Sequence, residues 1–101
     1  MYLLGFDIGG TKCAVVTALT DGNNIELLKN LAKTVRKDVA HMTALSRKRF
    51  IGELTGKQES ADRICGTLAA DLIAIMKGTD MLRVHDVNET VQTIAIYNSI
   101  E

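Results

Sequence analysis

The spacing of apolar and polar residues changes along the chain, and the change separates two kinds of predicted structure. Residues 2–8 and 13–19 are rich in apolar and β-branched residues, and Gly9 to Lys12 lie between them. Two such runs joined by a glycine-containing turn are typical of a β-hairpin. We therefore predict a pair of antiparallel strands at the start of the sequence, followed by turn residues at 20–24.

From residue 24 onward the apolar positions recur with the spacing of an α-helix. The apolar face of the first predicted helix is formed by Ile25, Leu28, Leu31, Ala32 and Val35. The basic residues lie off this face, as in an amphipathic helix that packs on a core. The apolar run 39–45 then predicts a short buried strand, and residues 50–54 predict the beginning of a short helix.

The clearest helix is predicted over residues 61–77. Ser60 precedes it as an N-cap, and Gly78 follows it at a position suited to a left-handed stop. Helical spacing assigns its buried face to Ile64, Leu68, Leu72, Ile75 and Met76.

Residues 81–87 alternate with a period of two, as in a strand, which places Arg83 and His85 on one side. Leu82 and Val84 fall on the opposite side. Asn88 is expected to cap a final helix whose apolar positions are Val91, Ile94, Ala95 and Ile100. From residue 24 the order is therefore helix, strand, helix, strand, helix, which is typical of a parallel α/β fold.

Length and charge limit the classes of protein that fit this pattern. The sequence has 101 residues, 47% of them apolar, and its 12 basic and 12 acidic residues give a formal net charge of zero. This length fits a single domain over residues 1–101 and excludes a complete TIM barrel, which needs about 250 residues. The charge balance removes the general electrostatic case for nucleic acid or an anionic membrane as a partner.

The cysteines and the start of the sequence bear on the cellular compartment. Cys13 and Cys65 lie far apart, and neither has a partner at metal-ligand spacing, so we expect a reduced, cytoplasmic protein. No basic residue precedes the apolar start, and Asp7 interrupts it, so we predict no signal peptide. No uninterrupted apolar run approaches the about 20 residues that cross a bilayer.

Cationic and hydrogen-bonding residues gather at the expected carboxyl ends of the two parallel strands. Ser46 to Arg49 follow the first strand, and Arg83 and His85 lie on the second. Ligands of parallel α/β folds bind at this edge, where arginine and lysine suit a phosphate group. We therefore predict a small substrate that carries phosphate. The alternative is that Arg47 to Arg49 form a solvated loop and that His85 is structural.

Three segments together resemble the C-terminal part of dihydropteroate synthases. They are Ser46-Arg-Lys-Arg-Phe-Ile-Gly52, Gly66-Thr-Leu-Ala-Ala70 and Arg83-Val-His-Asp-Val87, and the helix that begins at Asn24 is similar too. The resemblance covers residues 24–101 and implies the last two strands and last three helices of a TIM barrel. The implied fold class is α/β, with partial TIM-barrel-like β/α units and an added N-terminal β-hairpin.

The resemblance also implies a reaction and a set of binding residues. The family condenses p-aminobenzoate with a dihydropterin pyrophosphate in folate biosynthesis and releases pyrophosphate. Lys48 would contact the pterin, and the Ser46–Arg49 turn would border the p-aminobenzoate pocket. Arg83 would cover the pterin and, with His85, hold the pyrophosphate. The expected substrate-binding residues are thus Ser46, Arg47, Lys48, Arg49, Arg83 and His85. Arg49 stands where many family members have a small hydroxyl residue.

The N-terminal segment from Leu4 to Val16 resembles the opening of sugar kinases of the ROK family. In that family the glycine turn faces ATP phosphates, since backbone N–H groups at glycine approach phosphate closely. The alternative phosphate-binding residues are Asp7, Gly9, Gly10, Thr11 and Lys12. The turn alternatively serves only the hairpin, or is a degenerate form of a glycine-rich segment of dihydropteroate synthases. We favour two unrelated segments, 1–22 and 23–101.

Both resemblances lead to expectations about activity. Magnesium is implied for the synthase family, but the strands that would position it have no counterpart here, so no cofactor is assigned. We expect no significant synthase or kinase turnover from this chain alone, because positioning of both substrates supplies much of catalysis. Three interpretations remain open: a dihydropteroate synthase-like fragment with a phosphate or pyrophosphate site, a nucleotide-phosphate-binding kinase remnant, and a folded chimera without a ligand.

The same resemblances lead to expectations about assembly. The hairpin and the two barrel strands would make a mixed sheet of about four strands. Strand edges and apolar helix faces would be left exposed in this arrangement, which predicts a homo-oligomer.

Overall fold

The computed structural model of the chain describes residues 2–4, 7–8, 11–12, 16–18, 24–34, 38 and 40–101. Its strands are β1 (Tyr2–Leu4), β2 (Asp7–Ile8), β3 (Thr11–Lys12), β4 (Val16–Ala18), β5 (Met42–Thr43) and β6 (Met81–Leu82). Its helices are α1 (Asn24–Lys29), α2 (Leu31–Thr34), α3 (Arg49–Thr55), the 3₁₀ helix η1 (Ser60–Arg63), α4 (Ile64–Met76) and α5 (Val87–Ile100).

The N-terminal strands pair in the antiparallel way that the sequence predicts. β1 pairs with β4 and β2 pairs with β3, with Ile8 opposite Thr11. The pairs are separate two-stranded sheets, however, and β5 and β6 form a third. The expectation of one mixed sheet of about four strands is therefore wrong for the described residues, because the two antiparallel pairs do not join the parallel pair.

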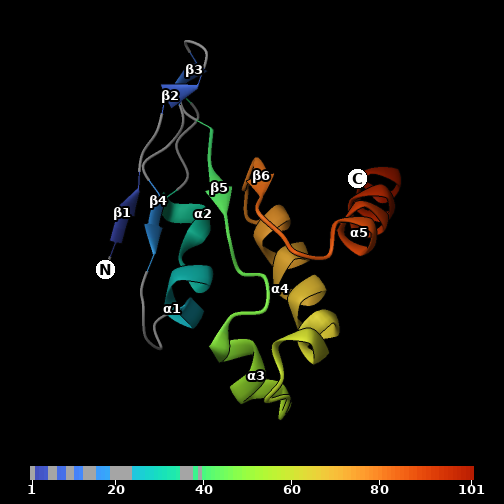
Figure 1. Cartoon of the computed structure of the whole chain (residues 1–101). Coiled ribbons are helices and arrows are strands. Elements are labelled where there is room, and N and C mark those ends of the chain that lie inside the picture. Colours follow the sequence, from blue (N-terminus) through green and yellow to red (C-terminus); the bar gives the residue numbers. More distant parts are fainter. Residues whose placement is uncertain are drawn as a thin grey trace.

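The parallel part of the fold follows the predicted order of helices and strands. β5 and β6 pair in parallel, with Met42 opposite Met81 and Thr43 opposite Leu82. α1 and α2 lie on one side of this pair and α5 on the other (Figure 1). Both strands are shorter than predicted, because the parallel backbone pairing ends at Thr43 and Leu82, and the segments that follow lead into α3 and α5.

Helix α4 buries a different face from the predicted one. Its buried residues are Thr67, Ala70, Asp71 and Ala74. The predicted face is half-buried at Ile64, Leu68, Leu72 and Ile75 and exposed at Met76. Apolar side chains occur around most of this helix, so spacing alone did not select the correct face. The face that carries small side chains is the buried one, because small side chains let α4 approach the core residues Leu45, Phe50 and Ile51 closely.

The two ends of α4 differ in how well the sequence predicted them. Gly78 has φ 105°, so the left-handed stop is confirmed. Ser60 is not the cap of an α-helix but the first residue of η1, and Arg63 precedes α4 without a capping side-chain hydrogen bond. Gly66 sits where a Cβ atom would lie 2.5 Å from Cγ2 of Ile51, so glycine is needed for the close contact between α3 and α4.

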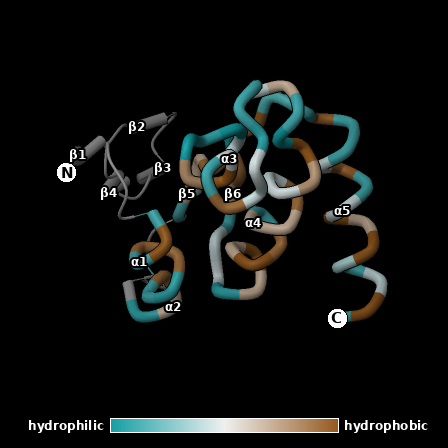
Figure 2. Tube along the Cα trace, turned by 90° about the horizontal axis from the view of Figure 1, so that it is seen from below, coloured by the Kyte–Doolittle hydropathy of each residue, from teal (hydrophilic) through white to brown (hydrophobic). Residues whose placement is uncertain are grey.

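Helix α5 begins one residue earlier than its predicted cap and leaves much apolar surface uncovered. Asp86, not Asn88, is the residue before the helix, and its side chain makes no capping hydrogen bond. Figure 2 shows apolar positions recurring along α5 to its end. Its exposed large apolar residues are Val87, Val91, Ile96 and Ile100. Among the described residues, no helix has the length and apolar character needed to cross a membrane.

Candidate functional site

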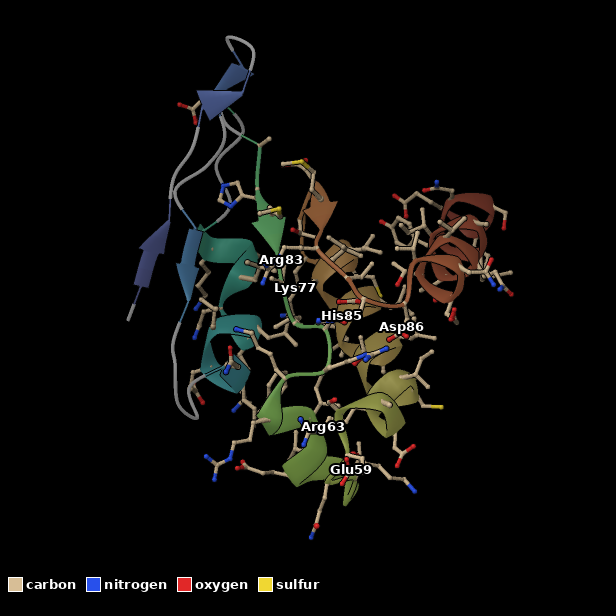
Figure 3. The ribbon with its side chains drawn as sticks, in the orientation of Figure 1. Glu59, Arg63, Lys77, Arg83, His85 and Asp86 are labelled. Atoms are coloured by element: carbon tan, nitrogen blue, oxygen red, sulfur yellow. The ribbon has the colours of Figure 1, made fainter. Side chains whose placement is uncertain are left out.

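The segments that follow β5 and β6 remain side by side beyond the last paired residues, and side chains hold them together. Partners in β5 and β6 differ by 39 positions, and the same separation joins Ser46 to His85 and Arg47 to Asp86. Figure 3 shows His85 and Asp86 on the segment beyond β6, where it passes the turn that leads from β5 into α3. Side chains therefore continue the register of the parallel pair past its backbone hydrogen bonds.

Ser46 makes two hydrogen bonds to His85. Its Oγ lies 2.8 Å from Nδ1 of the imidazole, and it accepts the main-chain N–H of His85 at 3.1 Å. One side chain thus holds both the ring and the backbone of this histidine. The predicted substrate-binding residue Ser46 is therefore placed beside His85 as the sequence implied, with its oxygen engaged in both contacts.

Arg47 is held through its side chain and through its main chain. Its guanidinium donates to both carboxylate oxygens of Asp86, at 2.8 Å from Nη2 and 3.3 Å from Nε. Its N–H donates to Oγ1 of Thr67 at 3.0 Å, and its carbonyl accepts from Arg63 at 2.9 Å. The hydrogen bonds from Arg47 lower the pKa of Asp86, and those to Asp86 raise the pKa of Arg47.

The backbone of Arg47 lies in the left-handed region, with φ 58°. A non-glycine residue adopts this conformation at a cost in free energy, because its Cβ atom approaches the following carbonyl oxygen. The ion pair with Asp86 and the two main-chain hydrogen bonds hold the residue there. Arg47 was predicted to bind substrate, and the structure places its guanidinium on Asp86.

Lys48 and Arg83 form the cationic part of the site. Burial lowers the pKa of Lys48, and the positive charge of nearby Arg83 lowers it further. Nζ of Lys48 donates to Oδ1 of the buried Asn24 at 3.3 Å. Within residues 24–34, 38 and 40–101, neither Lys48 nor Arg83 forms an ion pair with a carboxylate. Two neighbouring cations without a counter-charge are an arrangement suited to an anion.

The alternation predicted for the second strand appears as a pattern of exposure. Arg83 and His85 are exposed, whereas Leu82 and Val84 are half-buried. The prediction that Arg83 and His85 share one side is thus supported although β6 itself ends at Leu82. Among the described residues, Arg83, His85 and Lys48 are the predicted binding residues that form no ion pair with a carboxylate.

Arg49 is turned away from this group. It is the first residue of α3 and pairs with Glu53 at 3.0 Å, with 89% of the arginine side chain exposed. The structure therefore does not bring Arg49 together with the other predicted substrate-binding residues.

The alternative phosphate-binding segment is described only in part. Asp7 belongs to β2, and Thr11 and Lys12 form β3, paired with it. Gly9 and Gly10 lie outside the described residues.

Three residues that support the site were not among the predicted binding residues. Asn24 orients Lys48, Thr67 holds the main chain of Arg47, and Arg63 donates to the carbonyl oxygens of Arg47, Lys57 and Gln58. Arg63 lies on η1 and Thr67 on α4, far from the strand ends in sequence, so only the tertiary fold brings them to the turn.

Magnesium does not fit the described residues. No group of three His, Cys, Asp or Glu side chains among them is arranged to hold a metal ion. Lys48 and Arg83 are cations, and the carboxylate of Asp86 is engaged by Arg47. Hard cations prefer oxygen ligands, so we assign no metal to this site.

Comparison with known proteins agrees with this arrangement. The sequence profile described as pterin binding enzyme matches residues 6–85. The chain is 37% identical over 79 residues to the bifunctional dihydropteroate synthase/dihydropteroate reductase of Helicobacter pylori, a match that spans 78% of this chain and 20% of that protein. It is 38% identical over 74 residues to dihydropteroate synthase of Escherichia coli (strain K12), spanning 73% and 26%.

Solved structures of the same enzyme are similar in fold. Dihydropteroate synthase from Thermus thermophilus in complex with 6HMPPP is 41% identical, with a TM-score of 0.71, and the match covers 75% of this chain and 30% of that one. The enzyme from Xanthomonas albilineans in complex with 7,8-dihydropteroate is 40% identical, with a TM-score of 0.74, covering 77% and 30%. The chain thus spans between a fifth and a third of the length of these relatives.

The matched range bears on the N-terminal segment. The profile begins at residue 6 and so includes Asp7 to Lys12, which we had compared with sugar kinases. Those residues therefore gain no support as a segment of kinase origin, and the interpretation as two unrelated segments is replaced by one family match across both. The chain belongs to the family of pterin binding enzymes, and its helices and parallel strand pair match part of the barrel of dihydropteroate synthase.

Proposed function

We propose that the chain supplies part of the substrate site of a dihydropteroate synthase, in which Lys48, Arg83 and His85 bind the phosphate or pyrophosphate group of a dihydropterin substrate. The observation that carries the proposal is the pair of adjacent cations, Lys48 and Arg83, without a carboxylate partner among the described residues. An anion between them would remove the repulsion between the two like charges.

Arg83 and His85 supply different kinds of contact. A guanidinium offers a planar set of N–H donors that matches two phosphoryl oxygens at once, whereas an imidazole offers one ring N–H. Homologous synthases bind pterin ligands, and the two residues belong to the segment that resembles theirs. We further propose that the turn of Ser46 to Arg49 borders the p-aminobenzoate pocket, as the family resemblance implies.

The activity of a complete synthase is a separate proposal. The chain corresponds to between a fifth and a third of its relatives, so we expect pyrophosphate binding without measurable formation of dihydropteroate by this chain alone. A phosphate site at Asp7 to Lys12 remains the alternative, and of its residues Asp7, Thr11 and Lys12 lie in the paired strands β2 and β3.

Calorimetric titration of pyrophosphate into the chain tests the proposed site. Arg83→Ala should weaken binding at least about tenfold, because it removes hydrogen bonds between charged groups. Lys57→Ala removes one positive charge from an exposed position and serves as the matched control. Equal binding by the wild type and the Arg83 variant, or no binding by the wild type, would refute the proposal.

A further inference from the structure

Ser46 has a role that follows from the geometry of its hydroxyl group. A serine hydroxyl has one proton to donate and two lone pairs that accept. One lone pair of Ser46 is used by the main-chain N–H of His85 at 3.1 Å. The proton remains available for Nδ1 of the same residue, 2.8 Å away.

The hydrogen bonds of Ser46 favour one of the two nitrogens of His85 as the carrier of the proton. Among the described residues, Ser46 Oγ has no partner other than His85, so donation to Nδ1 is the arrangement that uses its proton within the protein. A neutral imidazole that accepts at Nδ1 is protonated at Nε2, on the opposite side of the ring. His85 is exposed, and its Nε2 lies on the side of the ring away from the contact with Ser46.

We propose that Ser46 is a positioning residue, which fixes His85 as the Nε2–H tautomer so that the ring presents a donor to a phosphoryl oxygen. The inference deepens the proposed function and rests on the anion site at Lys48, Arg83 and His85. With the opposite tautomer, Nε2 carries a lone pair and repels the anion. Ser46 thus acts through His85, without itself contacting the phosphate group.

The Arg47–Asp86 pair supports this role from the neighbouring position. It fixes the residues that follow Ser46 and His85 in the same register, at an identical separation of 39 positions. The serine oxygen therefore stays opposite the histidine ring, and little rotational freedom is lost when a ligand binds.

Long-range ¹H–¹⁵N NMR spectra of the imidazole nitrogens at about pH 8, above the ordinary histidine pKa, read the tautomer directly. In the wild-type chain, His85 should show the Nε2–H pattern, with His41 as an internal reference in the same spectrum. Ser46→Ala should shift His85 toward a mixture of tautomers and weaken pyrophosphate binding about tenfold. Ser46→Thr keeps the hydroxyl and should restore both properties, and Ser60→Ala is the control at an exposed serine.

The outcomes separate the inference from the proposed function. A predominant Nδ1–H tautomer in the wild type, or an unchanged tautomer and affinity in Ser46→Ala, would overturn the positioning role even if pyrophosphate binds. The Nε2–H tautomer without pyrophosphate binding would support the orientation of His85 by Ser46 and overturn the anion site. Backbone amide spectra of each variant distinguish loss of the hydrogen bond from loss of the fold.

Discussion

The guanidinium of Arg47 binds both carboxylate oxygens of Asp86, at 2.8 Å and 3.3 Å, across a sequence separation of 39 residues. This bidentate contact joins the turn after β5 to the residue that precedes α5. Arg47 of the basic turn thus joins the two strand ends, whereas binding of an anion by Lys48, Arg83 and His85 is the function that we propose.

Replacing Asp86 tests this link through pH. The contact with Arg47 lowers the pKa of Asp86 in the folded protein. The ionised carboxylate therefore stabilises the folded state at pH values above the pKa that Asp86 has in the unfolded chain. This stabilisation is lost as the pH falls through the lower pKa of the folded state. Asp86→Asn should therefore be less stable than the wild type at neutral pH, with the difference shrinking below about pH 4. Urea unfolding of both proteins across this pH range measures the difference in their free energies of unfolding. A difference that does not change with pH would contradict the ion-pair account.

The backbone conformation of Arg47 predicts a difference between two truncations. Arg47→Ala and Arg47→Gly both remove the guanidinium, but only glycine adopts φ 58° without strain. The glycine variant should have a folding equilibrium constant roughly tenfold larger than that of the alanine variant. Thermal and urea denaturation of both proteins give the comparison. An alanine variant as stable as the glycine variant would show that the left-handed conformation is not retained.

Asp71 predicts a second, opposite dependence of stability on pH. Its carboxylate is fully buried in α4 and has no hydrogen-bond partner among the residues that the structure describes, and burial raises its pKa from 3.8 to about 6. A carboxyl group whose pKa is higher in the folded than in the unfolded state favours folding at low pH, where it is protonated. This contribution to stability is lost as the pH rises toward and past the pKa of the folded state. The free energy of unfolding should fall by about 2 kcal/mol between about pH 4 and about pH 7 through this residue.

Asp71→Asn should remove this slope, because the amide does not ionise. Asp62→Asn makes the same change at an exposed carboxylate and is the control. Urea unfolding at several pH values provides the data. An unaltered slope in Asp71→Asn would mean that the buried carboxylate is not responsible.

The exposed apolar residues of α5 predict self-association. Ile96 is 63% exposed and Ile100 is 80% exposed, on a helix that the described part of the chain covers only along one side. Ile96→Glu combined with Ile100→Glu should lower the apparent mass toward that of a monomer, because burial of apolar surface drives association. Sedimentation equilibrium measures the apparent mass, and Asn98→Glu is the control for added charge. A wild-type chain that stays monomeric at high concentration would count against the prediction.

The sequence predicted the parts of this structure that depend on local pattern. The order of elements from Asn24, the parallel pairing of the strands that contain Met42 and Met81, and the left-handed stop at Gly78 all follow from periodicity and turn chemistry. The shared exposure of Arg83 and His85 follows in the same way, since a period of two places them on one side.

The remaining features depend on tertiary contacts that a local pattern does not contain. Spacing alone did not reveal that α4 packs through Ala70 and Ala74, because larger apolar residues surround most of the helix. The engagement of Arg47 by Asp86 depends on the register between segments far apart in sequence. For this reason the sequence did not reveal that Arg47, which the family motif places near the substrate, also joins the two strand ends.

The most direct test of the central claim is residue-resolved mapping of pyrophosphate binding by ¹H–¹⁵N NMR of the full chain. We predict saturable shifts of the amides from Ser46 to Lys48 and from Arg83 to His85, with the same dissociation constant for both segments. Shifts confined to Thr11 and Lys12 would place the anion at the N-terminal hairpin instead. A spectrum unchanged by pyrophosphate would contradict the anion site altogether.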